Sequence, residues 1–236
     1  MQGMRTKLWR WAEPRIPAGF VVLAVVLAVL PGCTAGGKLN PGSGGKQATT
    51  AKAVDVGRGA SVKRLDDGRQ GFAITETSRM NGESRNKFER AVAMMNKGEF
   101  GGAIDLLEKV IEQSPGVTAP YINLAMAYER TDEPEKAEQH LKTALTMVPQ
   151  HPVASNEYGL LLRKAGRFAE ARTIYEKTLA TFPEYLPAHK NLGILCDLYL
   201  NDLACAMEQY EMYSVAMPGD EQVKIWIADL RRRLGP

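Results

Sequence analysis

The chain has 236 residues, 44% of them hydrophobic and 24% charged, which is enough apolar content to bury a core and excludes disorder over the whole length. The formal net charge is +3, and residues 1–32 account for it because they hold four basic residues and one acidic residue. The other 204 residues carry 26 charges of each sign. A neutral domain lacks the positive surface that contacts phosphate backbones, so nucleic acid is not expected as a partner.

The N-terminal segment has the layout of a secretory signal. Residues 1–16 are polar and basic, and residues 18–30 form an apolar run of 13. A helix needs roughly 20 apolar residues to span a bilayer, so this run is shorter than a permanent span. We therefore predict that residues 1–32 are a signal peptide that directs export. An ordinary cleaved signal without lipid and an uncleaved anchor are the alternatives.

The end of this run resembles the lipobox of bacterial lipoproteins. Leu30 stands three positions before Cys33 and Gly32 directly before it, whereas Pro31 departs from the alanine or serine usual at that place. The resemblance implies that Cys33 becomes the mature N-terminus and carries acyl chains such as palmitate. Two or more chains hold a protein durably on a membrane. Because Thr34 follows the cysteine in place of aspartate, the resemblance also implies an outer-membrane lipoprotein that faces the periplasm.

Residues 33–83 are predicted to be the lipidated N-terminus followed by a mostly disordered tether. Residues 34–46 contain five glycines, one proline and a single aliphatic residue, which bury too little apolar surface to offset the entropy of ordering. The apolar patch at residues 72–74 interrupts this polar stretch. The patch is consistent with a short strand or with an extended arm on the following helices, and the sequence leaves both open.

A repeat of about 34 residues runs through the rest of the chain. Small residues, a second set of small residues and prolines each recur at this spacing, with turn residues between the two small sets. The four series are Ala91, Ala125, Gly159 and Gly193; Ala103, Ala137, Ala171 and Ala206; Pro115, Pro149, Pro183 and Pro218; and, at the turns, Gly98, Asp132, Gly166 and Asn201. Within each unit apolar residues follow helical spacing on both sides of the turn, which predicts two antiparallel helices. Proline ends the second helix of each pair.

These series resemble the tetratricopeptide repeat family, whose unit is a 34-residue helix–turn–helix. The resemblance implies an all-α fold: a right-handed superhelix of four units, preceded by the signal and the flexible tether. The units are 84–117, 118–151, 152–185 and 186–218. Larger side chains at one position of each unit are expected to fill the space between neighbouring units (Leu107, Leu141, Tyr175 and Tyr210). Residues 219–236 carry an apolar stripe and a plausible N-cap, Asp220, and are predicted to form a capping helix.

No motif for catalysis is found. The three histidines stand at different repeat positions, no pair of cysteines and histidines has metal-ligand spacing, and there is no Gly-x-Ser-x-Gly nucleophile motif. Residues 42–46 lack the first glycine and the final Ser or Thr of a phosphate-binding loop. We therefore predict a protein that is not an enzyme and has no cofactor, metal or small-molecule substrate.

Cys196 and Cys205 lie on opposite sides of the turn in the fourth unit. In an oxidising periplasm they would form a disulfide if their Cα atoms came within about 7 Å. The alternative, two reduced cysteines that act as small core residues, is the one favoured by the sequence analysis.

In the family, partner peptides usually lie in a concave groove lined by the first helix of each unit. The resemblance places thirteen residues there: Asn123, Met126, Glu129, Arg130, Asn156, Glu157, Leu160, Arg163, Lys164, Lys190, Asn191, Ile194 and Asp197. Asparagine amides can pair with a ligand's backbone through both donor and acceptor. The clamp for a terminal carboxylate found in chaperone-binding members is not expected, because Phe88, Val92, Val153 and Glu157 do not fit it.

The predicted function is that of a membrane-tethered scaffold or assembly factor for an envelope complex. The partner is expected to be a protein or peptide segment in the groove, and the N-terminal lipid to contact the membrane. Lipobox, tether and repeats are the layout of pilotins, which carry secretin subunits of type IV pili, so a pilus or secretion role is implied by analogy. The alternative is a docking accessory or regulator of an envelope polysaccharide or peptidoglycan enzyme.

Overall fold

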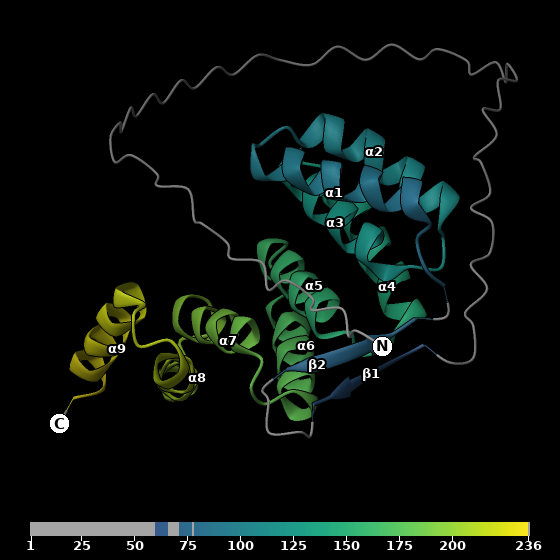
Figure 1. Ribbon diagram of the computed structural model, residues 1–236. Coiled ribbons are helices and arrows are strands. Elements are labelled where there is room, and N and C mark those ends of the chain that lie inside the picture. The colour runs from purple at the N-terminus through teal and green to yellow at the C-terminus, as the bar shows by residue number, and fades with distance from the viewer. Residues whose placement is uncertain (1–59, 66–70, 77, 236) are drawn as a thin grey trace, which may run out of the picture. The chain divides into compact units, whose positions relative to one another are not determined.

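The computed structural model describes residues 60–65, 71–76 and 78–235; the predicted signal peptide, Cys33 and the tether up to residue 59 lie outside them. Within the described residues the chain forms two strands and nine helices (Figure 1). They are β1 (Ser61–Arg64), β2 (Phe72–Thr75), α1 (Gly82–Asn96), α2 (Phe100–Gln113), α3 (Thr118–Arg130), α4 (Pro134–Met147), α5 (Pro152–Lys164), α6 (Phe168–Thr181), α7 (Leu186–Leu198), α8 (Leu203–Ala216) and α9 (Glu221–Leu234). None of the described helices is long and apolar enough to cross a bilayer.

The helices pack as antiparallel pairs in chain order. The pairs α1–α2, α3–α4, α5–α6 and α7–α8 make the closest contacts, and each pair contacts the next one, with α9 packed on α8. Figure 1 shows the array running from α1 to α9. The fold therefore fits the predicted superhelix of helical repeats.

The turn inside each pair has the same backbone geometry. Gly98, Asp132, Gly166 and Asn201 all adopt positive φ, between 51° and 82°. Glycine tolerates this region without strain, and asparagine and aspartate tolerate it better than other residues. The fourth turn has four residues between its helices where the others have three, so the extra residue of that unit is absorbed in the turn.

A small residue on the first helix of each pair meets a larger one on the second. An added Cβ on Gly159 would lie 2.6 Å from Cε1 of Tyr175, and one on Gly193 would lie 2.5 Å from Tyr210. The earlier units have alanine and leucine at these places, and both residues are buried. The larger residues also share core clusters with the following helices, as expected of residues that fill the space between units. Tyr175 and Tyr210 lie directly against the glycine of their own unit.

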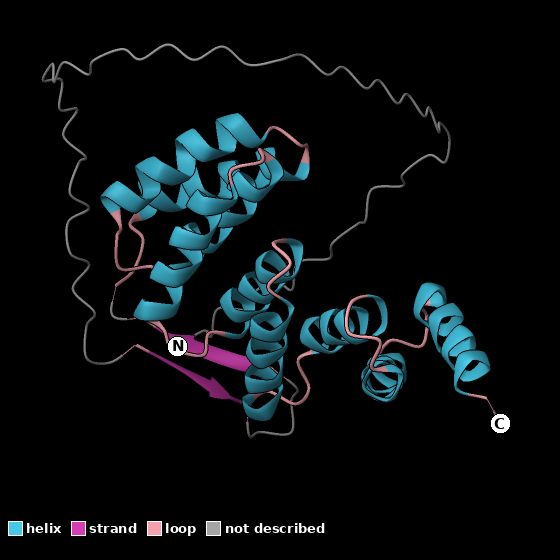
Figure 2. Ribbon diagram, turned by 180° about the vertical axis from the view of Figure 1, so that it is seen from behind, coloured by secondary structure: helices cyan, strands magenta, loops and turns pink. Residues whose placement is uncertain are grey.

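Residues 60–65 and 71–76 form a hairpin, which we call the N-terminal strap. Its two strands lie side by side (Figure 2). They are antiparallel, with Arg64 opposite Phe72. The Phe72 ring lies edge-on to Phe182 and Tyr185, at centroid distances of 5.8 and 5.9 Å, where α6 connects to α7. A two-stranded hairpin is marginal alone, so these contacts stabilise it. Residues 72–74 form a strand that also packs where α6 connects to α7, so the structure combines the two alternatives, and this part of the predicted tether is ordered.

The strap also reaches the start of α3. The Glu76 carboxylate accepts hydrogen bonds from the backbone N–H of Thr118 at 2.6 Å and from its hydroxyl at 2.5 Å. At the other end, Arg64 pairs with Glu184 at 2.8 Å. Because Thr118 opens the second unit and Glu184 lies before the fourth, the strap ties together junctions that are far apart along the array.

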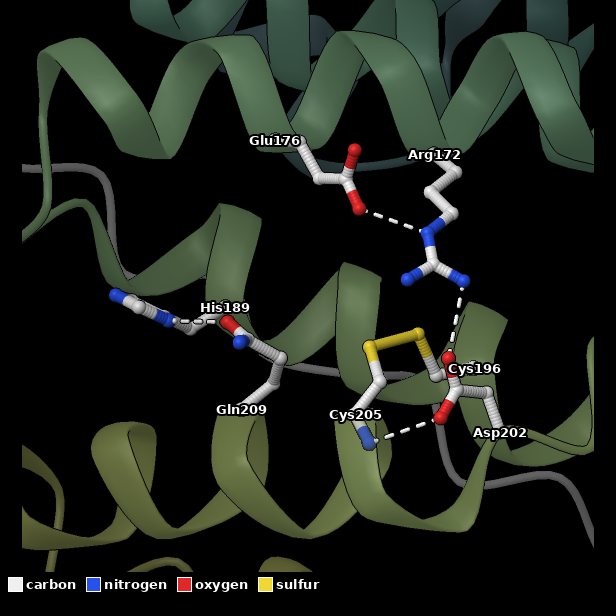
Figure 3. The surroundings of a disulfide bond; sticks show 7 residues. All are labelled: Arg172, Glu176, His189, Cys196, Asp202, Cys205 and Gln209. Atoms are coloured by element: carbon white, nitrogen blue, oxygen red, sulfur yellow. Dashed lines mark hydrogen bonds and ion pairs between the residues drawn. A yellow bond between two sulfur atoms is a disulfide. The ribbon is translucent and has the colours of Figure 1, made fainter.

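Cys196 and Cys205 form a disulfide, and their Cα atoms are 6.0 Å apart (Figure 3). The favoured expectation of two reduced cysteines is therefore corrected. Spacing alone did not decide it, because both alternatives bring the two residues together across the same turn. Asp202 accepts from the N–H of Cys205 at 3.1 Å and from Arg172 of α6 at 3.0 Å, so the disulfide lies beside a contact between two units.

Candidate protein-binding face

The thirteen residues predicted to line a groove all lie on α3, α5 and α7, the first helices of three successive pairs. These helices contact one another directly, as α1 and α3 also do. Among the described helices no comparable contacts join α2, α4, α6 and α8 to one another. The odd-numbered helices therefore approach each other on one side of the array. We call the surface that these thirteen residues form the A face.

Polar contacts join neighbouring helices of the A face at an offset of about one repeat. Residues 35 or 36 positions apart are paired in three places: Lys164 with Glu129, Asn191 Nδ2 with Asn156 Oδ1 at 3.0 Å, and Arg233 of α9 with Asp197 at 2.6 Å. Lys190 adds a contact to Asp220 at 3.0 Å, which anchors the start of α9. These pairs hold successive units in register.

Several of the residues predicted to bind a ligand use their side chains in contacts within the protein. Asn156 is only 3% exposed, and its amide holds Asn191 and Glu157. Asn123 donates to the Ala119 carbonyl of its own helix at 2.9 Å. The Asn156 side chain therefore joins helices where the sequence analysis expected it to grip a ligand, and replacing it would perturb the array itself. The residues left half-buried or exposed include Asn123, Met126, Leu160, Arg163 and Ile194.

Glu157 lies in the middle of the A face in an unusual environment. Burial raises the pKa of its carboxyl group to about 7, and the like charge of Glu129 acts in the same direction. The hydrogen bond from Asn156, at 3.0 Å, and the charge of Lys164 oppose the shift. Glu157 is therefore a carboxyl group that changes charge near neutral pH at the centre of the face.

Arg163, in the last turn of α5, is the second unusual group. Its side chain is half-buried, and its Nε is buried with no hydrogen-bond partner in the described structure. The guanidinium carbon lies 5.7 Å from the centre of the Tyr199 ring. Tyr199 and Leu198 are 46% and 67% exposed. Sequence reasoning missed both, although Leu198 follows Arg130 and Lys164 at the 34-residue spacing.

One candidate metal cluster and one open pocket occur among the described residues. The one candidate metal cluster within them is Cys196, Asp202 and Cys205, whose two sulfurs are joined and so are not thiolate ligands. An open pocket of about 290 Å³ lies between α5 and α6, and its lining is mostly apolar: Tyr158, Leu162, Ala169, Glu170, Thr173 and Ile174. Small-molecule sites usually add several convergent polar groups to such a lining.

The geometry defines an array of helical pairs with a largely polar face on α3, α5 and α7. Family models for the tetratricopeptide repeat match residues 86–159 and 157–185. These matches support tetratricopeptide repeats in the helical pairs between residues 86 and 185. Such repeats generally mediate protein–protein interactions, and their folds are typically non-enzymatic.

Solved structures with the same fold include pilF from Pseudomonas aeruginosa, at 24% identity and a TM-score of 0.58, covering 63% of this chain and 68% of that one. MamA from Desulfovibrio magneticus RS-1 has 17% identity and a TM-score of 0.56, covering 66% and 87%. At these identities the similarity shows the fold alone.

Curated relatives are much longer than the matched region. The probable UDP-N-acetylglucosamine–peptide N-acetylglucosaminyltransferase SPINDLY of Solanum lycopersicum is 26% identical over 151 residues, which is 64% of this chain and 14% of that protein. The human interferon-induced protein with tetratricopeptide repeats 2 is 29% identical over 131 residues, 50% of this chain and 28% of that one. The chain therefore spans only a small part of these relatives.

Proposed function

We propose that the protein is a membrane-tethered scaffold of the bacterial envelope that holds a segment of a partner protein against the A face. The observation that carries this proposal is the A face. There α3, α5 and α7, the first helices of three successive pairs, present half-buried polar and apolar side chains next to one another. The disulfide between Cys196 and Cys205 supports an oxidising compartment such as the periplasm. Attachment through a lipidated Cys33 follows from the lipobox resemblance.

Assembly of a pilus or secretion machine is the finer form of this proposal. It is supported by a layout shared with pilotins and, at the level of fold, by the similarity to pilF. Regulation of a polysaccharide or peptidoglycan enzyme by docking remains the alternative, and the two differ in which protein occupies the A face.

Photo-crosslinking in intact cells tests the occupied surface. A benzophenone amino acid at Leu160, which lies half-buried on α5, is expected to capture a discrete partner, whereas the same group at the exposed Lys177 of α6 should not. Mass spectrometry of the adduct then identifies the partner, and a secretin subunit or a polysaccharide synthase decides between the two forms. Equal capture from both positions, or capture from Lys177 alone, would move the interface away from the A face.

Membrane attachment is tested at the lipobox. Cys33→Ala is expected to release the protein from the membrane fraction, because the site of acylation is lost. Thr34→Asp should leave it membrane-bound but move it from the outer to the inner membrane, and Ser43→Ala in the tether should change neither property. Firm membrane association of the Cys33→Ala protein would rule out lipid anchoring at this residue.

A further inference from the structure

Two cations of the A face, Arg130 and Arg163, have no ion pair among the described residues, and only Arg163 is half-buried. Lys164 pairs with Glu129 and Lys190 with Asp220, whereas Arg163 has no ion pair within the described part of the chain. Arg130, which is exposed, lies 4.7 Å from the centre of the Phe100 ring. Arg163 is different, because its Nε is buried.

A buried donor without a partner costs free energy. An N–H removed from water and left unpaired typically costs about 1–3 kcal/mol. The buried Tyr175 hydroxyl lies nearby and interacts with the Arg163 side chain, although neither group reaches a partner at normal hydrogen-bond geometry. A side chain whose buried polar group is left unpaired in the fold is commonly one that binds a ligand or a partner.

We propose that Arg163 anchors an acidic side chain, aspartate or glutamate, of the segment bound to the A face, and that Leu198 and Tyr199 contact an apolar residue beside it. This inference rests on the proposed function and names the chemistry of the partner. A guanidinium forms paired, charge-assisted hydrogen bonds with a carboxylate. Partial burial strengthens the pair relative to one at an exposed surface.

The position of Arg163 favours a side chain over a chain terminus. Arg163 lies on α5, the middle helix of the A face, with the Glu129–Lys164 pair toward α3 on one side and the exposed Leu198 and Tyr199 at the end of α7 on the other. An extended segment that crosses the face therefore continues in both directions from Arg163. An internal acidic residue, followed or preceded by an apolar one, fits this arrangement.

Binding of defined peptides tests the chemistry directly. Three fluorescent probes are titrated with the full chain in detergent: a blocked peptide with Glu-Leu at its centre, the same peptide with Gln-Leu, and a peptide without acidic side chains that ends in a free carboxylate. The Glu-Leu peptide is expected to bind saturably, and the Gln-Leu peptide about tenfold more weakly. Arg163→Gln should remove this difference, whereas Arg130→Gln should preserve it. Equal binding of the two blocked peptides, preference for the free carboxylate, or no saturable binding would overturn the proposal.

Stability provides a second readout that needs no ligand. Arg163→Gln should leave the melting temperature unchanged or higher, since it removes an unpaired charge, whereas Asp197→Asn should lower it by breaking the pair with Arg233. A clear loss of stability in Arg163→Gln would identify the residue as structural and refute the proposal. If Arg163→Gln retains full crosslinking from Leu160, the inference fails while the proposed function stands.

Discussion

Replacing Gly159 by alanine is expected to destabilise the array by about 1–3 kcal/mol, although alanine is the better helix former. The added Cβ would lie 2.6 Å from the Tyr175 ring, and Tyr175 is fully buried, so neither group can move aside without disturbing its neighbours. Chemical denaturation followed by circular dichroism measures the loss. A shift of the midpoint without a change in slope would show that only stability changed.

A second substitution tests this explanation. Tyr175→Leu alone should cost about 2 kcal/mol because it leaves a cavity. The double variant Gly159→Ala with Tyr175→Leu recreates the alanine–leucine pair of the second unit, Ala125 and Leu141. Its loss of unfolding free energy should therefore be smaller than the sum of the losses of the two single variants. Gly101→Ala in α2 is the matched control, because its Cβ meets nothing within 4 Å and the change should be neutral or stabilising. Strict additivity would show that the clash is not the cause.

The contact between Gly159 and Tyr175 also shows which parts of the packing can be predicted from the sequence. The 34-residue spacing predicts the helical pairs, their turns and the positions of small and large residues, because every unit solves the same packing problem with local contacts. The spacing does not predict that a tyrosine on the second helix packs against a glycine on the first helix, whereas a leucine packs against an alanine. That match in size depends on the contact between the two helices. Only the structure places the Tyr175 ring against Gly159.

The strap and the A face fall outside what the repeat predicts. Phe72 contacts Phe182, 110 positions away in the sequence, and the strap has no counterpart among the four units. On the A face the repeat gives the helices that carry the candidate residues but not how their side chains are used. Asn156 and Asn123 look equivalent as exposed amides in the sequence, yet one is buried between helices and the other bonds its own helix. The role of the A face in binding stays a prediction.

Glu157→Gln is expected to make the protein more stable than the native chain at pH 8, with a gain that fades toward pH 4.5. The pKa of Glu157 is raised to about 7 from 4.5, so the folded state binds its proton more tightly than the unfolded state does. Ionisation of Glu157 therefore costs the native chain stability as the pH rises from 4.5 through 7, and above 7 this cost reaches about 3 kcal/mol at most. Glutamine is neutral at every pH and avoids that cost.

His140 and His151 act in the opposite direction, because burial lowers the pKa of both, and their contributions have to be separated from that of Glu157. Burial lowers the pKa of His151 to about 4, and its neutral Nδ1 accepts the N–H of Ala154 at the start of α5. The stability that His151 contributes is therefore lost as the pH falls from 6.5 through 4. Because the native chain and the Glu157→Gln variant share this loss, the difference between their melting temperatures at each pH isolates Glu157.

Glu138→Gln is the control with the opposite sign. Hydrogen bonds from Lys142 and then Arg167 lower the pKa of Glu138 to about 2, so its carboxylate stabilises the fold above pH 4.5 and this contribution disappears as the pH falls through 2. Glu138→Gln should therefore be less stable than the native chain at neutral pH, where Glu157→Gln is more stable. If both variants lost stability at pH 8, the Glu157 carboxylate would be satisfied in the fold, and the A face would carry a fixed negative charge at its centre.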